Sequence, residues 1–326
     1  MDRVSKTSLV FLGTFLLIIT VSFILSFLVP DIAGNMPVYA DILLTQSLIA
    51  FPAFMYLKKT GRNVRTVAKK GNFGLVSVLI LFALAFFCIP VAAVMNVLSS
   101  ALFGNAVSPV MERTAALPRF WNILFFAVLP AIVEEHVFRG FYYHEFRHLG
   151  FFRAMLACAL FFGIMHMNLN QFSYGFVLGM IFCFVLEATG SIYAPMLIHF
   201  GINFTSVNLS DLLLSGNETA GMETAAGMDA QYMQLEAALM SPGGIEASTI
   251  LLYTVLAVAA VISLGICILL IWLLAKVNNR DGYISWIING GEKKSLERYG
   301  KAKLLTPAFM AAVLTGFGIM ILTHFL

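Results

Sequence analysis

The chain has 326 residues, of which 60% are hydrophobic and 11% are charged, and its mean hydropathy is +0.89. A soluble domain carries about 25% charged residues, so this composition excludes an ordinary soluble protein and indicates a polytopic membrane protein. The formal net charge of +3 says little by itself, and we expect no nucleic-acid partner.

Nine apolar runs are long enough, or nearly long enough, to cross a bilayer, which takes about 20 residues of helix. Because backbone amides in hydrocarbon must be satisfied within the protein, such runs form helices. We expect the first run to be a transmembrane helix, since the apolar part of a cleavable signal is shorter. The sequence therefore predicts an all-α polytopic transmembrane bundle of about nine helices, over the runs 8–28, 38–57, 73–98, 120–138, 154–167, 172–187, 191–214, 249–275 and 306–326.

The basic residues predict the orientation of the chain. Cytoplasmic loops of membrane proteins are enriched in Lys and Arg. With nine alternating spans and a cytoplasmic N-terminus, all of the 20 basic residues except Arg113 and Arg119 fall on the cytoplasmic side. We therefore expect one integral membrane domain, 1–326, in the cytoplasmic membrane of a bacterium, with a basic cytoplasmic loop at 276–305 and an acidic extracytoplasmic loop at 215–248.

Polar residues interrupt the apolar sequence at three places between 130 and 204. The interruptions read EEHVFR at 134–139, FGIMH at 162–166 and HFGIN at 199–203. Ionisable side chains at membrane depth are expensive and usually mark a functional site. We expect the three segments to meet in one intramembrane active site built on the fourth to seventh helices.

The first segment carries two adjacent carboxylates with different neighbours. Glu135 and Arg139 are four residues apart on one helix face and can form a structural ion pair. Glu134 is rotated by about 100° from Glu135, which leaves it free to act as a general base. The alternative is that both glutamates are polar residues at the membrane interface.

The other two segments also contain pairs one helical turn apart. Phe162 can pack against the imidazole of His166 and fix its orientation, while His199 and Asn203 can together donate to a developing oxyanion. The alternative is a set of structural interhelical hydrogen bonds. Taken together, the segments offer a carboxylate, two imidazoles, an amide and a guanidinium, which suffice for peptide hydrolysis by water. No serine or cysteine lies beside a plausible base, which disfavours covalent catalysis.

The set EExxxR, FxxxH and HxxxN, in this order on apolar helices, resembles the motifs of the CPBP intramembrane proteases. This family is also called the Abi or type II CAAX prenyl endopeptidase family, and it includes bacteriocin-processing relatives. The resemblance covers about residues 119–206. It implies an intramembrane endopeptidase that meets a peptide or protein substrate, in some cases a lipidated one, in the lipid bilayer.

The resemblance also implies roles for individual residues. Glu134 would activate water together with His166, and His199 and Asn203 would donate to the oxyanion. Glu135, Arg139 and Phe162 would support them. The alternative function is a catalytically silent scaffold, or a bacteriocin immunity or binding protein, that keeps the family's fold. A transporter ranks last, because we see neither inverted repeats nor broken helices.

Two zinc sites compete with this hypothesis. The family was long described as metal-dependent, and Glu134, His166 and His199 would form a valid His2Glu set, although we favour a mechanism without a metal. Residues 144–148 read HEFRH, which matches the HExxH zinc-protease signature. Arg147 lies inside that motif and opposes a cation, so we expect a polar continuation of the fourth helix there.

The depth of the site gives one further expectation. With simple spans, Glu134 lies near the cytoplasmic end of the fourth helix, whereas His166 lies about 18 Å along the fifth run. For them to meet, we expect the fourth helix to continue to about His148.

Overall fold

The computed structural model describes residues 2–62, 73–104, 118–215, 247–292 and 303–325. It confirms the all-α bundle, because each of the nine predicted runs coincides with a helical segment. Seven of the described segments are long and apolar enough to cross a membrane, and α10 is a shorter apolar helix. The helical segments are α1 (Arg3–Phe23) with η1 (Ile24–Leu28), α2 (Pro30–Gly34), α3 (Val38–Lys59), α5 (Leu75–Phe103), α7 (Arg119–Asn122), η2 (Ile123–Val128), α8 (Leu129–Glu135), η3 (His136–Tyr142), α9 (Tyr143–Phe146), η4 (Arg147–Leu149), α10 (Phe151–Met165), α11 (Leu169–Thr189), α12 (Tyr193–Ser215), α14 (Ala247–Val277), α15 (Asp281–Ile288) and α17 (Pro307–Phe325).

The fourth span is one long helical segment from Arg119 to Leu149, made of α7, η2, α8, η3, α9 and η4 in succession. It confirms the expectation that this helix reaches about His148. Two of its parts, η2 and η3, are π-helical, a local widening that is frequent at functional sites. The second of these turns follows directly after Glu135.

A tight turn then sets the depth of the site. Gly150 has φ +94°, a conformation that favours glycine, and it reverses the chain into α10. Glu134 precedes Gly150 by 16 residues and His166 follows it by 16, so both lie about 24 Å from the turn. Phe138 and Phe162 lie 12 positions before and after Gly150, and their ring centroids are 5.0 Å apart. Residues at equal distances from the turn are therefore paired between the fourth span and α10.

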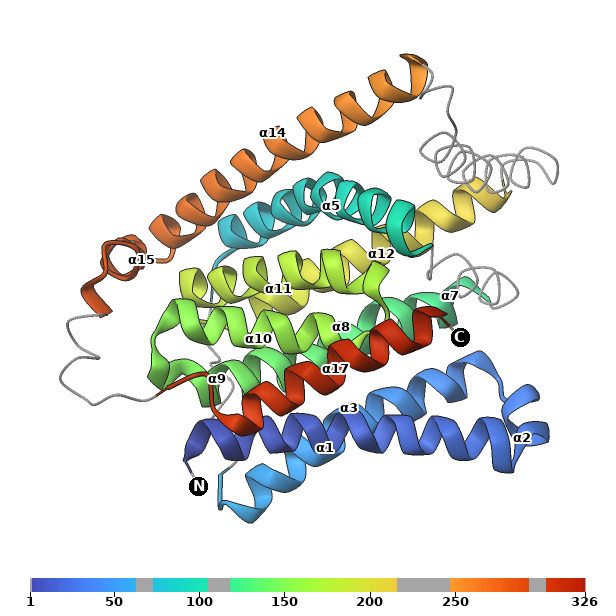
Figure 1. Cartoon of the computed structure of the whole chain (residues 1–326). Helices are drawn as coiled ribbons and strands as arrows, with labels where there is room; N and C mark the ends of the chain where they lie inside the picture. Colours follow the sequence, from blue (N-terminus) through green and yellow to red (C-terminus); the bar gives the residue numbers. More distant parts are fainter. Residues whose placement is uncertain (1, 63–72, 105–117, 216–246, 293–302, 326) are drawn as a thin grey trace.

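The fourth to seventh spans lie in the middle of the bundle (Figure 1). On one side α5 packs against α11, α12 and α14, and on the other α1 packs against α3 and α17. Aromatic side chains join these layers. Phe11 of α1 stacks on Phe161 of α10, with centroids 3.9 Å apart, and Phe161 stacks on Phe309 of α17. The flanking helices thereby cover part of the surface of the central ones.

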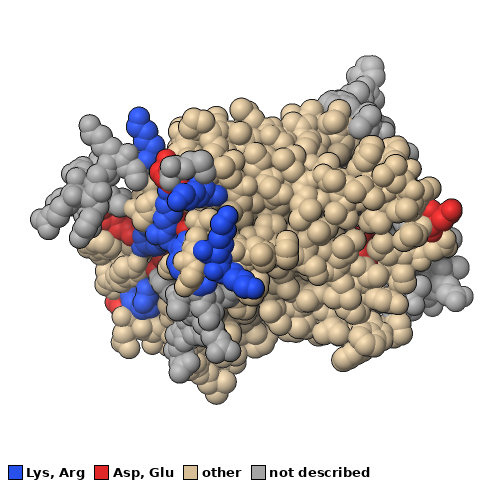
Figure 2. All heavy atoms as spheres, turned by 90° about the horizontal axis from the view of Figure 1, so that it is seen from below, with Lys and Arg blue, Asp and Glu red and all other residues tan. Residues whose placement is uncertain are grey.

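The charges are concentrated at one end of the molecule. Figure 2 shows Lys and Arg gathered at the end that carries the N-terminus, α9 and α15, next to a wide surface without charge. At this end the buried carboxylate of Glu187 accepts hydrogen bonds from Tyr143 and Arg147, and it faces Arg280 at 3.5 Å. This network holds α9, α11 and the start of α15 together. Residues 216–246 of the predicted acidic loop and residues 293–302 of the predicted basic loop lie outside the described residues.

Candidate active site

The predicted ion pair of Glu135 and Arg139 is present in the site. Both side chains are fully buried, and Arg139 Nη1 donates to Glu135 Oε1 over 2.9 Å. The guanidinium carbon lies 4.4 Å from the ring centroid of Phe162 and 4.9 Å from that of Phe182, and Nη2 donates to the carbonyl of Gly179. Two aromatic faces, a carbonyl and a carboxylate therefore compensate one buried positive charge.

His199 is bound to the same carboxylate. Its Nδ1 lies 2.9 Å from Glu135 Oε1, and since a carboxylate can only accept, Nδ1 is the donor. The opposite ring nitrogen, Nε2, faces Glu134 Oε2 at 4.0 Å. The sequence predicted Glu135 as a partner of Arg139 alone. The structure adds a second task, because the carboxylate also fixes the ring orientation of His199.

Glu134 lies beside this pair and has a separate partner. Its side chain is 13% exposed, and Oε1 accepts a hydrogen bond of 2.8 Å from Nε2 of Gln46 on α3. Glu134 has no partner on its own helix, as predicted, but the sequence reasoning missed Gln46. The only signal for it was a neutral polar side chain, flanked by Thr45 and Ser47 in an otherwise apolar stretch, and this does not reveal which helix it faces.

His166 ends α10 at the same depth. Its Nδ1 lies 2.9 Å from the carbonyl of Phe162, which can only accept, so Nε2 is the free ring nitrogen. The next residue, Met167, has φ +56°. This is uncommon for a residue other than glycine, and it turns the chain toward α11. Asn168 secures the turn by donating to the His166 carbonyl and capping α11.

Phe162 connects the two imidazoles. Its ring meets His166 edge-on at a centroid distance of 5.1 Å and His199 at 6.0 Å. The predicted packing of Phe162 on His166 is therefore present, and a contact with His199 is added. Asn203 lies one turn beyond His199 on α12 and is half-buried, but no hydrogen bond, ion pair or ring contact among the described residues joins it to the other site residues.

The same geometry shows whether the site residues could bind a metal ion together. Among the residues that the structure describes, no group of three or more His, Cys, Asp and Glu side chains could hold a metal ion. Of the hypothetical zinc set, Glu134 and His199 face each other at 4.0 Å, whereas the described contacts of the His166 ring are with Phe162 and not with either of these two side chains. The three side chains in this arrangement therefore do not fit a shared zinc ion, and we derive no catalytic step through one.

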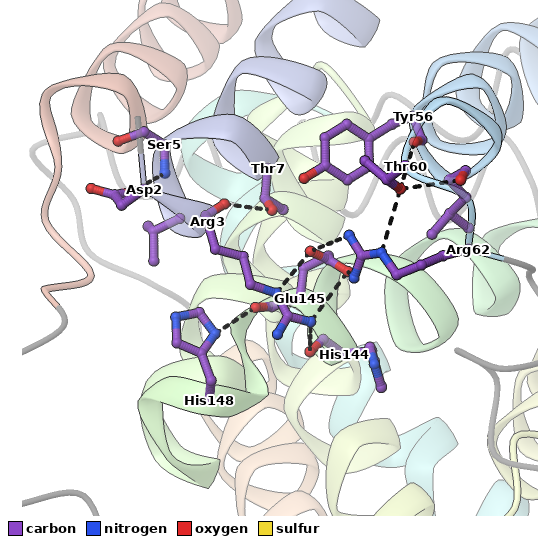
Figure 3. Close-up of polar contacts among 12 residues, drawn as sticks. Asp2, Arg3, Ser5, Thr7, Tyr56, Thr60, Arg62, His144, Glu145 and His148 are labelled. Carbon is purple, nitrogen blue, oxygen red and sulfur yellow. Dashed lines mark hydrogen bonds and ion pairs between the residues drawn. The ribbon is translucent and has the colours of Figure 1, made fainter. Parts of the chain in front are cut away.

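The HExxH segment has a different environment (Figure 3). Glu145 is fully buried, and its carboxylate accepts from Arg3 over 2.9 Å and from Arg62 over 3.1 Å. The hydrogen bond to Glu145 raises the pKa of Arg62 above its ordinary value. His148 Nδ1 lies 2.8 Å from the backbone carbonyl of Glu145. Both carboxylate oxygens are engaged by guanidinium groups, so Glu145 ties α9 to the start of α1 and the end of α3.

Comparison with known proteins gives one result. Residues 114–205 match a family described as Rce1-like, type II CAAX prenyl endopeptidase Rce1-like. The match supports, over these residues, the family that the motifs indicate. It supports a multi-pass membrane protease of the CPBP and CAAX type that acts on a peptide or protein substrate. No curated protein and no solved structure matches the chain. The matched segment contains all seven predicted site residues, but it does not contain Gln46.

Proposed function

We propose that the protein is an intramembrane endopeptidase of the glutamic type, in which Glu134 activates the attacking water. The proposal is carried by the pair of adjacent carboxylates with unequal partners. Glu135 is neutralised by Arg139, whereas Glu134 is bound by an uncharged amide. Glu134 is thus not held in an ion pair with a guanidinium, which leaves its carboxylate able to take a proton as a general base.

The gap between Glu134 and His199 is suited to a water molecule. A water oxygen about 2.8 Å from both polar atoms is compatible with their separation of 4.0 Å. In the proposed reaction, Glu134 takes a proton from this water while the water oxygen bonds to the scissile carbonyl carbon. The carbon–nitrogen bond then breaks, and the same proton passes to the leaving amine. His166 assists through its free Nε2, in the role that the family resemblance implies.

His199 and Asn203 are the proposed oxyanion donors. With Nδ1 bound to Glu135, His199 offers an Nε2–H donor when the ring is protonated. Asn203 would supply the second donor from the next turn of α12.

The family match and the distribution of charges support a proposal for the substrate and its direction of approach. We propose a membrane-associated peptide or protein, including lipidated ones, with the basic end of the molecule in the cytoplasm. The active site would then lie about 24 Å from the turn at Gly150. A lipid-modified peptide could reach this depth from within the bilayer.

Substrate trapping tests this function in cells. Membranes from cells that express Glu134→Gln are compared with membranes from wild-type cells, and the peptides that accumulate are identified by mass spectrometry. We expect uncleaved precursors that disappear when the wild-type protein is restored. Equal peptide sets in both membranes, with an unchanged phenotype after alanine replaces Glu134, His166, His199 and Asn203, would favour the non-catalytic scaffold.

The metal-free mechanism has its own test. The purified protein in nanodiscs is assayed before and after treatment with a zinc chelator and exhaustive dialysis. We expect the cleavage rate of a prenylated CAAX peptide to remain unchanged. A rate that is lost on chelation and restored by added zinc would contradict the glutamic mechanism and support a metalloprotease.

A further inference from the structure

The nearest partner of the proposed base comes from outside the segment that matches the family. Gln46 lies on α3, 88 residues before Glu134, and its side chain is buried. Its Nε2 donates to Glu134 Oε1 over 2.8 Å, and α3 packs directly on α8. We propose that Gln46 is a positioning residue that holds the carboxylate of Glu134 in its reactive orientation. This inference rests on the proposed function.

The direction of this hydrogen bond follows from the chemistry of the two groups. A carboxylate accepts only, and an amide has one donor end and one acceptor end. Turning the amide of Gln46 round would bring its carbonyl oxygen against the carboxylate of Glu134. Nε2 therefore faces Oε1, and the second carboxylate oxygen, Oε2, is left to face His199 at 4.0 Å.

The other end of the amide is costly for stability. Gln46 Oε1 is buried and has no hydrogen-bond partner in the described structure, and an unsatisfied buried acceptor destabilises a fold. The residues one and two turns further along the buried face of α3 are the apolar Ile49 and Ala53. A side chain that served packing alone would be apolar at this position too, so the polar group at position 46 indicates a role in the site.

A neutral donor suits this role better than a cation would. Arg139 holds Glu135 as a charged pair, and a second guanidinium at Glu134 would weaken its ability to take a proton. The amide of Gln46 fixes one oxygen without adding charge. The long side chain of Glu134 is then held with Oε2 toward the place of the water. Two adjacent glutamates thus differ in function because two different helices supply their partners.

The substitution Gln46→Met tests the proposal, because methionine has a similar length and no donor. A hydrogen bond to a charged group is worth enough to predict that kcat falls about tenfold to hundredfold. KM should change by less than about twofold, since the proposal gives Gln46 no contact with the substrate. The melting temperature should change little, because the lost hydrogen bond to Glu134 is offset by removal of the unsatisfied carbonyl oxygen.

Ser47→Ala is the matched control on the same helix. Ser47 is exposed, and its hydroxyl donates to the carbonyl of Leu43 one turn earlier. This variant should keep the wild-type kcat, KM and melting temperature. Kinetics are measured in nanodiscs with a fluorogenic peptide that ends in a farnesylated CAAX sequence, and Glu134→Gln is run in parallel.

An infrared measurement detects the hydrogen bond between Gln46 and Glu134 in the absence of turnover. The infrared carboxylate band of Glu134 is identified as the difference between the wild type and Glu134→Gln. We expect this band to shift in Gln46→Met and to remain in place in Ser47→Ala.

The outcomes separate this inference from the proposed function. A Gln46→Met protein with full kcat, or with an unmoved carboxylate band, overturns the role of Gln46 even when Glu134→Gln is inactive. A loss of kcat that is matched by a lower melting temperature assigns Gln46 a merely structural role. Equal cleavage by the wild type and Glu134→Gln instead overturns the proposed function itself.

Discussion

At the scale of single residues, the site depends on one buried carboxylate oxygen. Oε1 of Glu135 accepts from Arg139 and from His199, each at 2.9 Å, while Oε2 is buried without a partner among the described residues. The ion pair therefore does more than neutralise a charge. It fixes the ring of His199 so that Nε2 faces Glu134.

Substitution of Arg139 tests this arrangement. Arg139→Met leaves the fully buried Glu135 without its cation, and breaking a buried pair in this way costs about 3–5 kcal/mol. Arg139→Lys should not restore stability, because an ammonium group lacks the planar fork that contacts the rings of Phe162 and Phe182. Thermal unfolding in detergent should show a lowered melting temperature for both variants. A wild-type melting temperature for Arg139→Met would rule out this account of the pair.

The residue scale is also where sequence reasoning reached its limit. The pair of Glu135 with Arg139 and the contact of Phe162 with His166 follow from a spacing of four on one helix, so they were predictable. The contact of His199 with Glu135 spans 64 residues, and that of Gln46 with Glu134 spans 88. Such contacts depend on how helices pack, and no local periodicity in one sequence records that.

At the scale of elements, the site depends on the hairpin of the fourth span and α10 and on its packing against α11. The nine runs and the extension of the fourth helix were predictable, because apolar length and helical rise determine them. The π-helical turns and the left-handed turn at Met167 were not, since ordinary residue types occupy them. The packing of α10 on α11 includes a close approach at Gly179.

Gly179→Ala should disturb this packing. A Cβ atom at Gly179 would lie 3.0 Å from Ala159 Cα and 3.4 Å from Arg139 Nη2, which is tighter than ordinary contact. We expect the variant to lose about 1–3 kcal/mol of stability and a large part of its activity, because Arg139 must shift. Unfolding and cleavage assays are run together on each variant.

Gly265→Ala is the control for this experiment. Gly265 lies within α14, and a Cβ atom there would meet nothing within 4 Å. Alanine in a helix interior is favoured over glycine by about 0.5–1 kcal/mol, so stability should hold or rise and activity should not change. Equal losses in the Gly179 and Gly265 variants would contradict the proposed close contact of α10 and α11.

At the scale of the whole molecule, the charged residues distinguish one end of the bundle from the other. Guanidinium groups and their buried carboxylates gather where α9 and α15 lie, with Glu145 and Glu187 as the two acidic centres. Because Glu145 connects α1 and α3 to α9, its ion pairs hold α1 and α3 next to the site. The HExxH segment thus has a structural role, which is to connect helices of the bundle.

Cysteine labelling tests the proposed orientation. Asn35 and Lys59 are exposed residues near opposite ends of α3, and the four native cysteines are buried. A membrane-impermeant maleimide should label Asn35→Cys in intact cells and Lys59→Cys only after the membrane is permeabilised. The reverse pattern would place the N-terminus outside the cytoplasm and contradict the proposed topology.

The most direct test of the central claim compares two glutamate variants with the wild type. The cleavage of a farnesylated CAAX peptide is measured in nanodiscs for Glu134→Gln and for Glu145→Gln, at equal amounts of folded protein. General-base catalysis contributes about 10²–10⁴ in rate. We therefore predict that Glu134→Gln loses at least about a hundredfold in kcat and that folded Glu145→Gln stays near the wild-type rate. Full activity in Glu134→Gln together with loss in Glu145→Gln would contradict the account and move the active site to the HExxH segment.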